Sequence, residues 1–400
     1  MRGKNADFKD LELILCDLIE NTDINNNTYY DEEESALLNS IVLHIFTQYN
    51  TLNESLIENV IDHINDLILQ HIKVVPPVYS DSQLAYLKDK LDYLEKIPQP
   101  EQRTPEWYEF RNNRLTASDL YHITSQSKGK IIDIVKKKCG VEKNYTPGAA
   151  ILHGVKFEDV AIDIYEKREK VKITEFGCLP HSNIPFFGAS PDGICSFASE
   201  NKNYTGRMLE IKCPKSRNIT GIIPPVYFAQ VQGQLEVCDL EYCDFLECQI
   251  REYNSKQEFF EDTHETNYKL RKNGMEKGIV LEVYDTELKK TKYYYNYDKF
   301  RNEEDLNSWE EKFIDEILSD SKLEYNKTTF WRLEKYNIVL VKRNREWFTN
   351  NYLKIAMFWN QVLEARVNNT YAEDILNCKK KTVSFYPKKN DKNDEFQFLD

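Results

Sequence analysis

The spacing of apolar residues divides the first hundred residues into helical segments. Residues 8–19, 33–49, 54–72 and 80–96 place apolar side chains at helical spacing, and in the third segment these are Ile57, Ile61, Ile64, Ile68 and Ile72. Prolines at 76 and 77 interrupt the pattern, and prolines at 98 and 100 end it. We therefore predict a separate helical module at residues 1–97.

Shorter runs beyond residue 180 predict strands. Residues 186–189, 194–197 and 207–213 are apolar or alternating, and turn residues at 190–193 and 198–206 separate them. In the last run Leu209 and Ile211 alternate with Glu210 and Lys212, so one strand face is apolar and the other is charged. Pro214 ends that strand, because proline cannot donate to a ladder.

Helices are predicted around these strands. Thr104 and Pro105 hold favoured N-cap and first-turn positions, so a helix begins there and ends near residue 113. Thr116 to Asp119 begin a second helix, residues 148–168 form a third, and residue 225 begins a fourth.

The pattern in the C-terminal third of the chain predicts further strands and a helix that belong to the same core. Residues 278–284 and 292–297 read as two strands that extend the sheet. Residues 344–366 form an amphipathic helix with a core-facing stripe, namely Phe348, Tyr352, Ile355, Trp359 and Val362. We therefore predict a core at residues 98–345, a helix packed on it within 346–378, and a flexible charged tail at 379–400.

Charge is unevenly distributed along the chain. The net charge is −13, but residues 1–100 alone hold 18 Asp and Glu against 7 Lys and Arg. Beyond them the charges nearly balance, with basic clusters at residues 128–138 and 167–172. These clusters predict either contacts to a phosphate backbone or solvated helix faces.

Composition narrows the class of protein. Hydrophobic residues make up 41% of the chain, which excludes a disordered protein, and no run of eighteen apolar residues predicts a membrane span. Nine cysteines are scattered without a CxxC pair, which predicts reduced thiols and argues against an iron–sulfur cluster. The seven histidines show no zinc-site spacing. We expect a soluble intracellular protein without a membrane partner.

Two acidic residues of the predicted hairpin are candidate metal ligands. Asp192 follows the strand at 186–189, and the hairpin brings it beside Glu210. Carboxylate oxygens are hard ligands suited to Mg²⁺ or Mn²⁺. Lys212, on the same strand face as Glu210, is placed to steer an attacking water or offset charge on a phosphate. The alternative is a surface hairpin with an i, i+2 charge pair.

A third carboxylate lies upstream. Glu158 shares a stripe of the predicted helix with four apolar residues, namely Ile151, Val155, Ile162 and Tyr165. We predict that this stripe is buried, and a buried carboxylate needs a cation or hydrogen-bond donors to compensate it. The alternative is a glutamate at the helix edge, paired with Lys156.

Two further groups are suited to binding phosphate. Ser118 lies at a predicted helix N-terminus, where backbone N–H groups attract anions, and Arg111 ends the preceding helix. Gln230 and Gln234 share a helix face, and their amides can donate without changing the local charge. The alternatives are a capped helix with a surface arginine and a solvated helix edge.

Between residues 98 and 252 these motifs resemble, in their order, the YqaJ-type viral recombinase and lambda-type exonuclease family of the PD-(D/E)xK nuclease superfamily. The six matching segments are Trp107 to Arg111, Leu115 to Ser118, Gly154 to Glu158, Gly188 to Gly193, Glu210 to Pro214, and Tyr227 to Gln232. Six collinear motifs are specific where one is not. The resemblance implies an α/β restriction-endonuclease-like core, a mixed central sheet flanked by helices, here with an N-terminal helical domain.

By resemblance, Glu158, Asp192, Glu210 and the backbone carbonyl of Ile211 are metal ligands, and Lys212 orients the water nucleophile. Two ions, Mg²⁺ or Mn²⁺, occupy such a site. The residues that correspond to substrate-binding positions of the family are Arg111, Ser118, Ser190, Arg217 and Gln230. Arg217 departs from the family's spacing by one residue.

The resemblance implies a DNA exonuclease that resects 5′-phosphorylated ends of linear duplex DNA in the 5′ to 3′ direction, in viral recombination, repair or end processing. It also implies a single-strand annealing partner, and the phage enzyme is a ring-shaped homo-oligomer. The expected location is the cytoplasm, at a viral replication site, or the nucleus of a host cell. The alternatives are an endonuclease using the same metal site and a catalytically silent DNA-binding scaffold.

Overall fold

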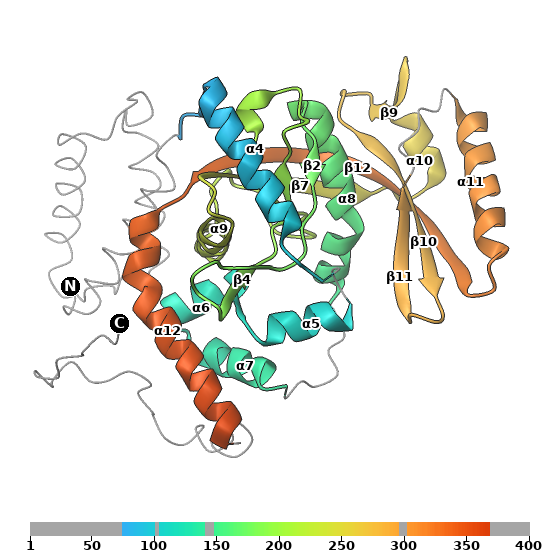
Figure 1. Cartoon of the computed structure of the whole chain (residues 1–400). Helices are drawn as coiled ribbons and strands as arrows, with labels where there is room; N and C mark the ends of the chain where they lie inside the picture. The colour runs from blue at the N-terminus through green and yellow to red at the C-terminus, as the bar shows by residue number, and fades with distance from the viewer. Residues whose placement is uncertain (1–73, 101–103, 141–147, 296–301, 369–400) are drawn as a thin grey trace, which may run out of the picture.

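The computed structural model describes residues 74–100, 104–140, 148–295 and 302–368 (Figure 1). Most of the predicted N-terminal module and the whole predicted tail lie outside these residues, as do the predicted helices at 8–19, 33–49 and 54–72. Those assignments stay predictions. Within the described residues, no helix is long and apolar enough to cross a membrane.

A seven-stranded mixed sheet lies at the centre, in the strand order β11-β10-β12-β7-β6-β5-β2. Only β6 and β7 pair in parallel, and the other neighbours are antiparallel. Helix α9 connects the two parallel strands. The strands are β2 (Ile173–Thr174), β5 (Gly193–Cys195), β6 (Met208–Lys212), β7 (Tyr242–Glu252), β10 (Lys277–Asp285), β11 (Lys290–Tyr295) and β12 (Leu323–Lys342).

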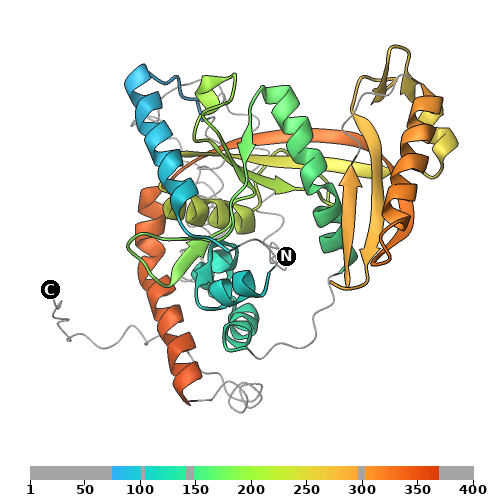
Figure 2. The same cartoon turned by 45° about the vertical axis from the view of Figure 1, so that its right-hand side comes forward.

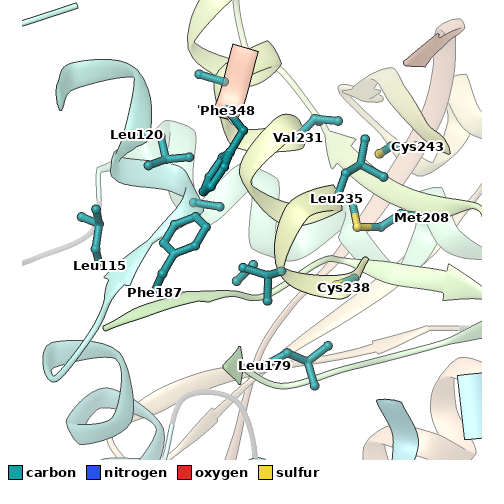
Figure 3. Close-up of a cluster of buried hydrophobic side chains, with 14 of the residues drawn as sticks. Leu115, Leu120, Leu179, Phe187, Met208, Val231, Leu235, Cys238, Cys243 and Phe348 are labelled. Atoms are coloured by element: carbon teal, nitrogen blue, oxygen red, sulfur yellow. The ribbon is translucent and has the colours of Figure 1, made fainter. Parts of the chain in front are cut away.

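Helices cover both faces of this sheet, which confirms the predicted α/β core. On one face lies α8 (Ala149–Glu169), whose Phe157 and Val160 pack with Leu209 and Leu246 of the sheet. The other face carries α9 (Pro225–Cys238) and α12 (Arg345–Asn368), joined by α4 (Asp81–Lys96), α6 (Leu120–Thr124) and α7 (Lys128–Lys138). Figure 3 shows part of this second cluster, with Val231 and Leu235 of α9 among its buried side chains.

The alternation predicted for residues 207–213 is confirmed in β6. Leu209 and Ile211 enter the cluster beneath α8, whereas Met208 enters the cluster on the α9 side. Burying a side chain of this size stabilises the fold by about 1.5–3 kcal/mol. The same alternation holds Glu210 and Lys212 on the α9 side of the strand.

The predicted helix at 148–168 is confirmed, but the predicted stripe is buried only toward its C-terminal end, where Tyr165 is buried and Ile162 packs against the cluster beneath α8. Ile151 is 48% exposed, whereas His153, Lys156, Phe157, Val160, Ala161, Ile164 and Tyr165 are buried. The prediction is wrong for the N-terminal half, because there the sheet packs against the adjacent stripe that carries Phe157 and Val160. Glu158 is therefore turned away from the core.

A lobe at one end extends the sheet, as the two predicted strands imply; β10 and β11 pair there as an antiparallel hairpin. Its own small core joins Tyr253, Phe259, Ile279 and Leu306. The lobe also contains α10 (Lys256–Glu261), α11 (Glu303–Leu318), β8 (Thr263–His264) and β9 (Asn267–Arg271). In both views β12 runs across the molecule from this lobe to α12 (Figures 1 and 2).

A second sheet has three strands in the order β1-β4-β3. Its strands are β1 (Leu115–Thr116), β3 (Leu179–Pro180) and β4 (Phe187–Ala189). Helix α5 (Pro105–Asn112) begins at the predicted N-cap, since Thr104 accepts from the backbone N–H of Trp107. The predicted helix start at Thr116 is confirmed, although its first turn is 3₁₀: Thr116 is the N-cap, Ala117–Asp119 form the 3₁₀ turn, and α6 follows directly.

Helix α4 confirms the predicted helix at residues 80–96. Ser80 forms a capping box with Gln83, and Leu91 and Leu94 are buried in the α9-side cluster. Because this helix shares the core of the sheet, a truncation that tests the N-terminal module should remove residues 1–73 and keep α4.

Candidate active site

A cavity of about 540 Å³ opens between the N-terminal half of α8, the end of β6 and the start of α9. The loop after β6 forms part of its wall. The cavity is lined by Ala150, Ile151, Gly154, Val155, Glu158, Asp192, Ile211, Lys212, Cys213, Pro214, Lys215, Ser216, Arg217 and Tyr227. Five predicted site residues therefore share one cavity, namely Glu158, Asp192, Ile211, Lys212 and Arg217.

Asp192 lies between β4 and β5, where the chain turns into the hairpin. Its Oδ2 accepts a hydrogen bond of 2.7 Å from the backbone N–H of Ile211, which fixes the carboxylate against β6. Burial and the nearby carboxylates of Glu210 and Glu158 raise the pKa of Asp192 well above its ordinary value. A carboxyl group under that repulsion is stabilised by an added cation.

Glu210 is almost fully buried and lies behind the cavity wall. Gln230 donates to its Oε1 at 2.6 Å and Gln234 to its Oε2 at 2.7 Å, while Lys212 also contacts Oε1. The alternative of an exposed hairpin with a surface charge pair is therefore wrong. A buried carboxylate with three donors is held in one orientation.

Lys212 extends along the same strand face. Burial alone lowers the pKa of Lys212, but the carboxylates of Glu210 and Asp192 outweigh it, so the net shift is upward. Its Nζ also lies 4.8 Å from the centre of the Tyr227 ring. The ammonium group is therefore charged at neutral pH and positioned by neighbours on β6 and α9.

Gln234 is a site residue that the sequence prediction did not select, although its face on the helix was noted. It joins Glu210 to the turn before Asp192, because its Nε2 also lies 3.2 Å from the carbonyl oxygen of Ser190. The solvated helix edge proposed as an alternative is wrong, since Gln232 and Gln234 are each only 1% exposed. The signal in the sequence was a set of three glutamines, Gln230, Gln232 and Gln234, within a helix whose other residues are mostly apolar.

The predicted phosphate-binding residues lie in a neighbouring group. Arg111 donates to Ser190 Oγ at 3.0 Å, and its guanidinium lies over the Trp107 ring at 4.4 Å. Ser118 Oγ lies 3.2 Å from Thr116 Oγ1 within the 3₁₀ turn. Ser190 thus connects Arg111 with the turn that carries Asp192.

A buried ion pair underlies this group. Lys138 Nζ lies 3.5 Å from Asp119 and donates to the carbonyl oxygen of Arg111 at 3.0 Å. The sequence places Lys138 in a basic cluster that faces phosphate or solvent, but its side chain is 1% exposed. The sequence could not reveal this, because Lys136 and Lys137 beside it have the same character.

Arg217 lies in the cavity wall but is already engaged. It contacts Glu247 of β7 at 2.5 Å, and that carboxylate is fully buried. Lys156, the lysine that the alternative interpretation paired with Glu158, has its Nζ 2.8 Å from both Glu252 and Glu282. Lys156 points to the lobe side of α8 rather than into the cavity.

The donor set suits a divalent cation. Glu158 and Asp192 line the cavity, Glu210 lies beside Asp192, and Lys212 is the nearby cation. Among the described residues, no three His, Cys, Asp or Glu side chains are already close enough to hold a metal ion. Oxygen donors of this kind match Mg²⁺ or Mn²⁺ rather than zinc. All seven cysteines in the described part are free thiols.

Comparison with solved structures finds exonucleases at low similarity. An alkaline exonuclease from Laribacter hongkongensis is 17% identical, with a TM-score of 0.38, over 68% of this chain and 100% of that chain. A phage-related exonuclease from Haemophilus somnus is 10% identical, with a TM-score of 0.34, over 63% of this chain and 95% of that chain.

Sequence comparison gives a relative and a family. Uncharacterized protein R354 of Acanthamoeba polyphaga mimivirus is 31% identical over 337 residues, which are 78% of this chain. The matched region spans only 61% of that relative's length. Residues 106–241, which contain the carboxylates, both glutamines and the arginines at 111 and 217, match the model of the YqaJ-like viral recombinase domain. Residues 106–241 of this chain therefore carry a YqaJ-like viral recombinase domain.

Proposed function

We propose that this protein is a divalent-metal-dependent deoxyribonuclease that degrades duplex DNA from its ends. The observation that carries the proposal is the meeting of Glu158, Asp192 and Lys212 in one cavity, with Glu210 held behind it. The recombinase domain supports DNA as the substrate.

In this proposal Glu158, Asp192, Glu210 and the carbonyl oxygen of Ile211 hold one or two Mg²⁺ or Mn²⁺ ions. Bound there, such ions lower the pKa of a water and stabilise the leaving oxygen of an in-line displacement. The Ile211 N–H orients Asp192, and the two glutamines orient Glu210. Lys212 places a fixed positive charge beside the position of the reacting phosphate.

An enzyme that starts at DNA ends needs a contact that only an end provides. The Arg111 guanidinium donates to the Ser190 hydroxyl beside the turn that carries Asp192, and Ser118 lies on the neighbouring 3₁₀ turn. We assign these groups to a terminal 5′-phosphate, which favours resection in the 5′ to 3′ direction. Resection in that direction leaves a 3′ single-stranded overhang, which a single-strand annealing partner would bind at a site of viral DNA replication. A ring-shaped oligomer would make resection processive.

The Arg111→Ala variant tests the terminal-phosphate assignment. We expect its kcat/KM on 5′-phosphorylated linear duplex to fall about a hundredfold, because a charge-assisted bidentate contact is lost. On unphosphorylated duplex the loss should be only a few-fold. The matched control is Arg168→Ala, which removes an arginine paired with Glu276 outside the cavity. Equal losses on both substrates would favour the endonuclease alternative.

Gln234→Ala tests the orientation of Glu210. We expect cleavage to fall about tenfold to a hundredfold, because removing a hydrogen-bond donor to a metal-ligating carboxylate typically has an effect of that size. Gln232→Ala is the control, since that buried amide bonds to Lys342 and Asn344 instead. Both variants lose a buried glutamine of α9, so only a difference in activity between equally folded proteins supports the assignment.

The activity itself is tested with end-labelled linear duplex DNA in Mg²⁺, with and without a 5′-phosphate, beside a closed circle. We expect degradation of the linear DNA only, with stimulation by the phosphate. Cutting of the circle would indicate an endonuclease. Binding without cleavage in both Mg²⁺ and Mn²⁺ would indicate a silent scaffold.

A further inference from the structure

Gly154 is an unusual residue for its position. It lies in the second turn of α8, a helix of 21 residues, where glycine destabilises the helix relative to alanine. Its backbone is helical and has no positive φ, so conformational freedom is not the reason for a glycine here. Some other requirement must exclude a side chain.

Packing within the protein does not supply that requirement. A Cβ added to Gly233 of α9 would lie 2.4 Å from Leu120 and 3.0 Å from Ala117, so close helix packing explains that glycine. A Cβ added to Gly154 would meet no atom within 4 Å. The space beside Gly154 is therefore open.

The open space belongs to the cavity that holds the carboxylates. Gly154 lies at the centre of the cavity-facing stripe of α8, with Ile151 and Val155 as neighbours and Glu158 one helical turn further on. Lys212, Lys215 and Arg217 line the same cavity and give it positive charge. A gap in an apolar wall, close to carboxylates and cations, suits a sugar–phosphate backbone.

We infer that Gly154 keeps this gap open for the backbone of the DNA strand being cleaved, and so determines how closely the strand approaches Glu158. The inference rests on the proposed nuclease function. Side chains at position 154 would hold the strand away from the carboxylates without disturbing the fold.

The test is a size series, Gly154→Ala and Gly154→Leu, with Gly129→Ala and Gly129→Leu as controls. Gly129 is also helical, in α7, and a Cβ there would also meet no atom within 4 Å, but it lies outside the cavity. All four variants should fold, because alanine and leucine favour helices, and Gly154→Ala should unfold about 2 °C higher than wild type.

The affinity for linear duplex DNA is measured in Ca²⁺, alongside Mn²⁺ binding and Mg²⁺-dependent cleavage. We expect DNA affinity and kcat/KM to fall about fivefold for Gly154→Ala and about a hundredfold for Gly154→Leu, as for overpacking of a filled site. Mn²⁺ affinity should stay unchanged, as should every property of the Gly129 variants apart from stability.

Two outcomes would overturn the inference and are distinguishable. If wild type binds and cleaves DNA and Gly154→Leu does so equally well, the gap does not receive the strand and the nuclease proposal stands. If wild type neither binds nor cleaves DNA, the proposed function fails and the inference fails with it.

Discussion

Asp192→Asn should lower DNA cleavage by roughly a thousandfold, while the protein remains folded and still binds DNA. Asparagine keeps the shape of the side chain and its contact with the Ile211 N–H, but it removes the charge that holds a divalent ion. Losses of this size follow when a group that stabilises the transition state electrostatically is removed. Lys212→Ala should give a comparable loss.

The same variant should be more stable than wild type when metal is removed with a chelator. In the folded protein, burial and the carboxylates of Glu210 and Glu158 raise the pKa of Asp192 above its unfolded value of 3.8. The folded state then binds the proton more tightly, so stability falls as the pH rises from about 4 through the raised folded pKa. Asparagine carries no charge and avoids this loss, and its unfolding midpoint at neutral pH should be higher.

Thermal unfolding in chelator and in Mg²⁺, together with cleavage assays, checks both expectations. Mg²⁺ should raise the midpoint of wild type but not that of Asp192→Asn, because ligands that bind only the folded state stabilise it. Asp163→Asn is a suitable control, since Asp163 lies on α8 in an i, i+4 pair with Lys167. If Asp192→Asn cleaved DNA normally, the assignment of the metal site would be wrong.

The sequence was sufficient for the parts of the site that depend on local patterns. Alternation in 207–213 correctly placed Leu209 and Ile211 opposite Glu210 and Lys212, and the turn at 190–193 placed Asp192 beside β6. Both are short-range relations, set by the period of a strand and the length of a hairpin.

Relations between distant elements were not predictable in the same way. The helix at 148–168 has two apolar stripes, and only packing against the sheet decides which is buried. The strand β12 was not predicted, because Lys327 and Lys335 occupy the strand face that carries Leu323, Tyr325, Trp331 and Leu333, although β12 pairs with β7 and β10 along most of its length. A run of lysines likewise does not show which member is buried, and Lys138 is buried beside Lys136 and Lys137.

Asp119→Ala should destabilise the protein by about 3–5 kcal/mol, the usual result of removing one partner of a buried ion pair. Below its lowered pKa, Lys138 would be an uncompensated charge inside the fold, where its side chain is 1% exposed and its remaining contact is the carbonyl oxygen of Arg111. Asp92→Ala removes the partner of an exposed pair with Lys88, at 47% and 45% exposure, and should leave the unfolding midpoint nearly unchanged.

The loss of folding stability in Asp119→Ala should depend on pH. Lys138 holds Asp119 ionised and lowers its pKa against the effect of burial, so the stabilisation by Asp119 is present above about pH 4 and is lost as the pH falls through its folded pKa. Burial lowers the pKa of Lys138 to about 8, so above that pH the lysine loses its charge and no longer needs a partner. Without Asp119 the pKa of Lys138 falls further, so the difference between wild type and Asp119→Ala should be largest just above about pH 4 and should decline toward pH 8.

A second variant separates the uncompensated charge from the loss of packing. Asp119→Ala combined with Lys138→Met removes the buried ammonium and keeps a side chain of similar length, so most of the stability should return. Unfolding by urea at pH 7 measures both variants. A double variant no more stable than Asp119→Ala would show that the aspartate acts through its bond from Thr116 rather than through Lys138. Lys138 also donates to the backbone carbonyl of Arg111, and Lys138→Met removes that contact. The double variant should therefore recover stability and still lose the preference for phosphorylated ends.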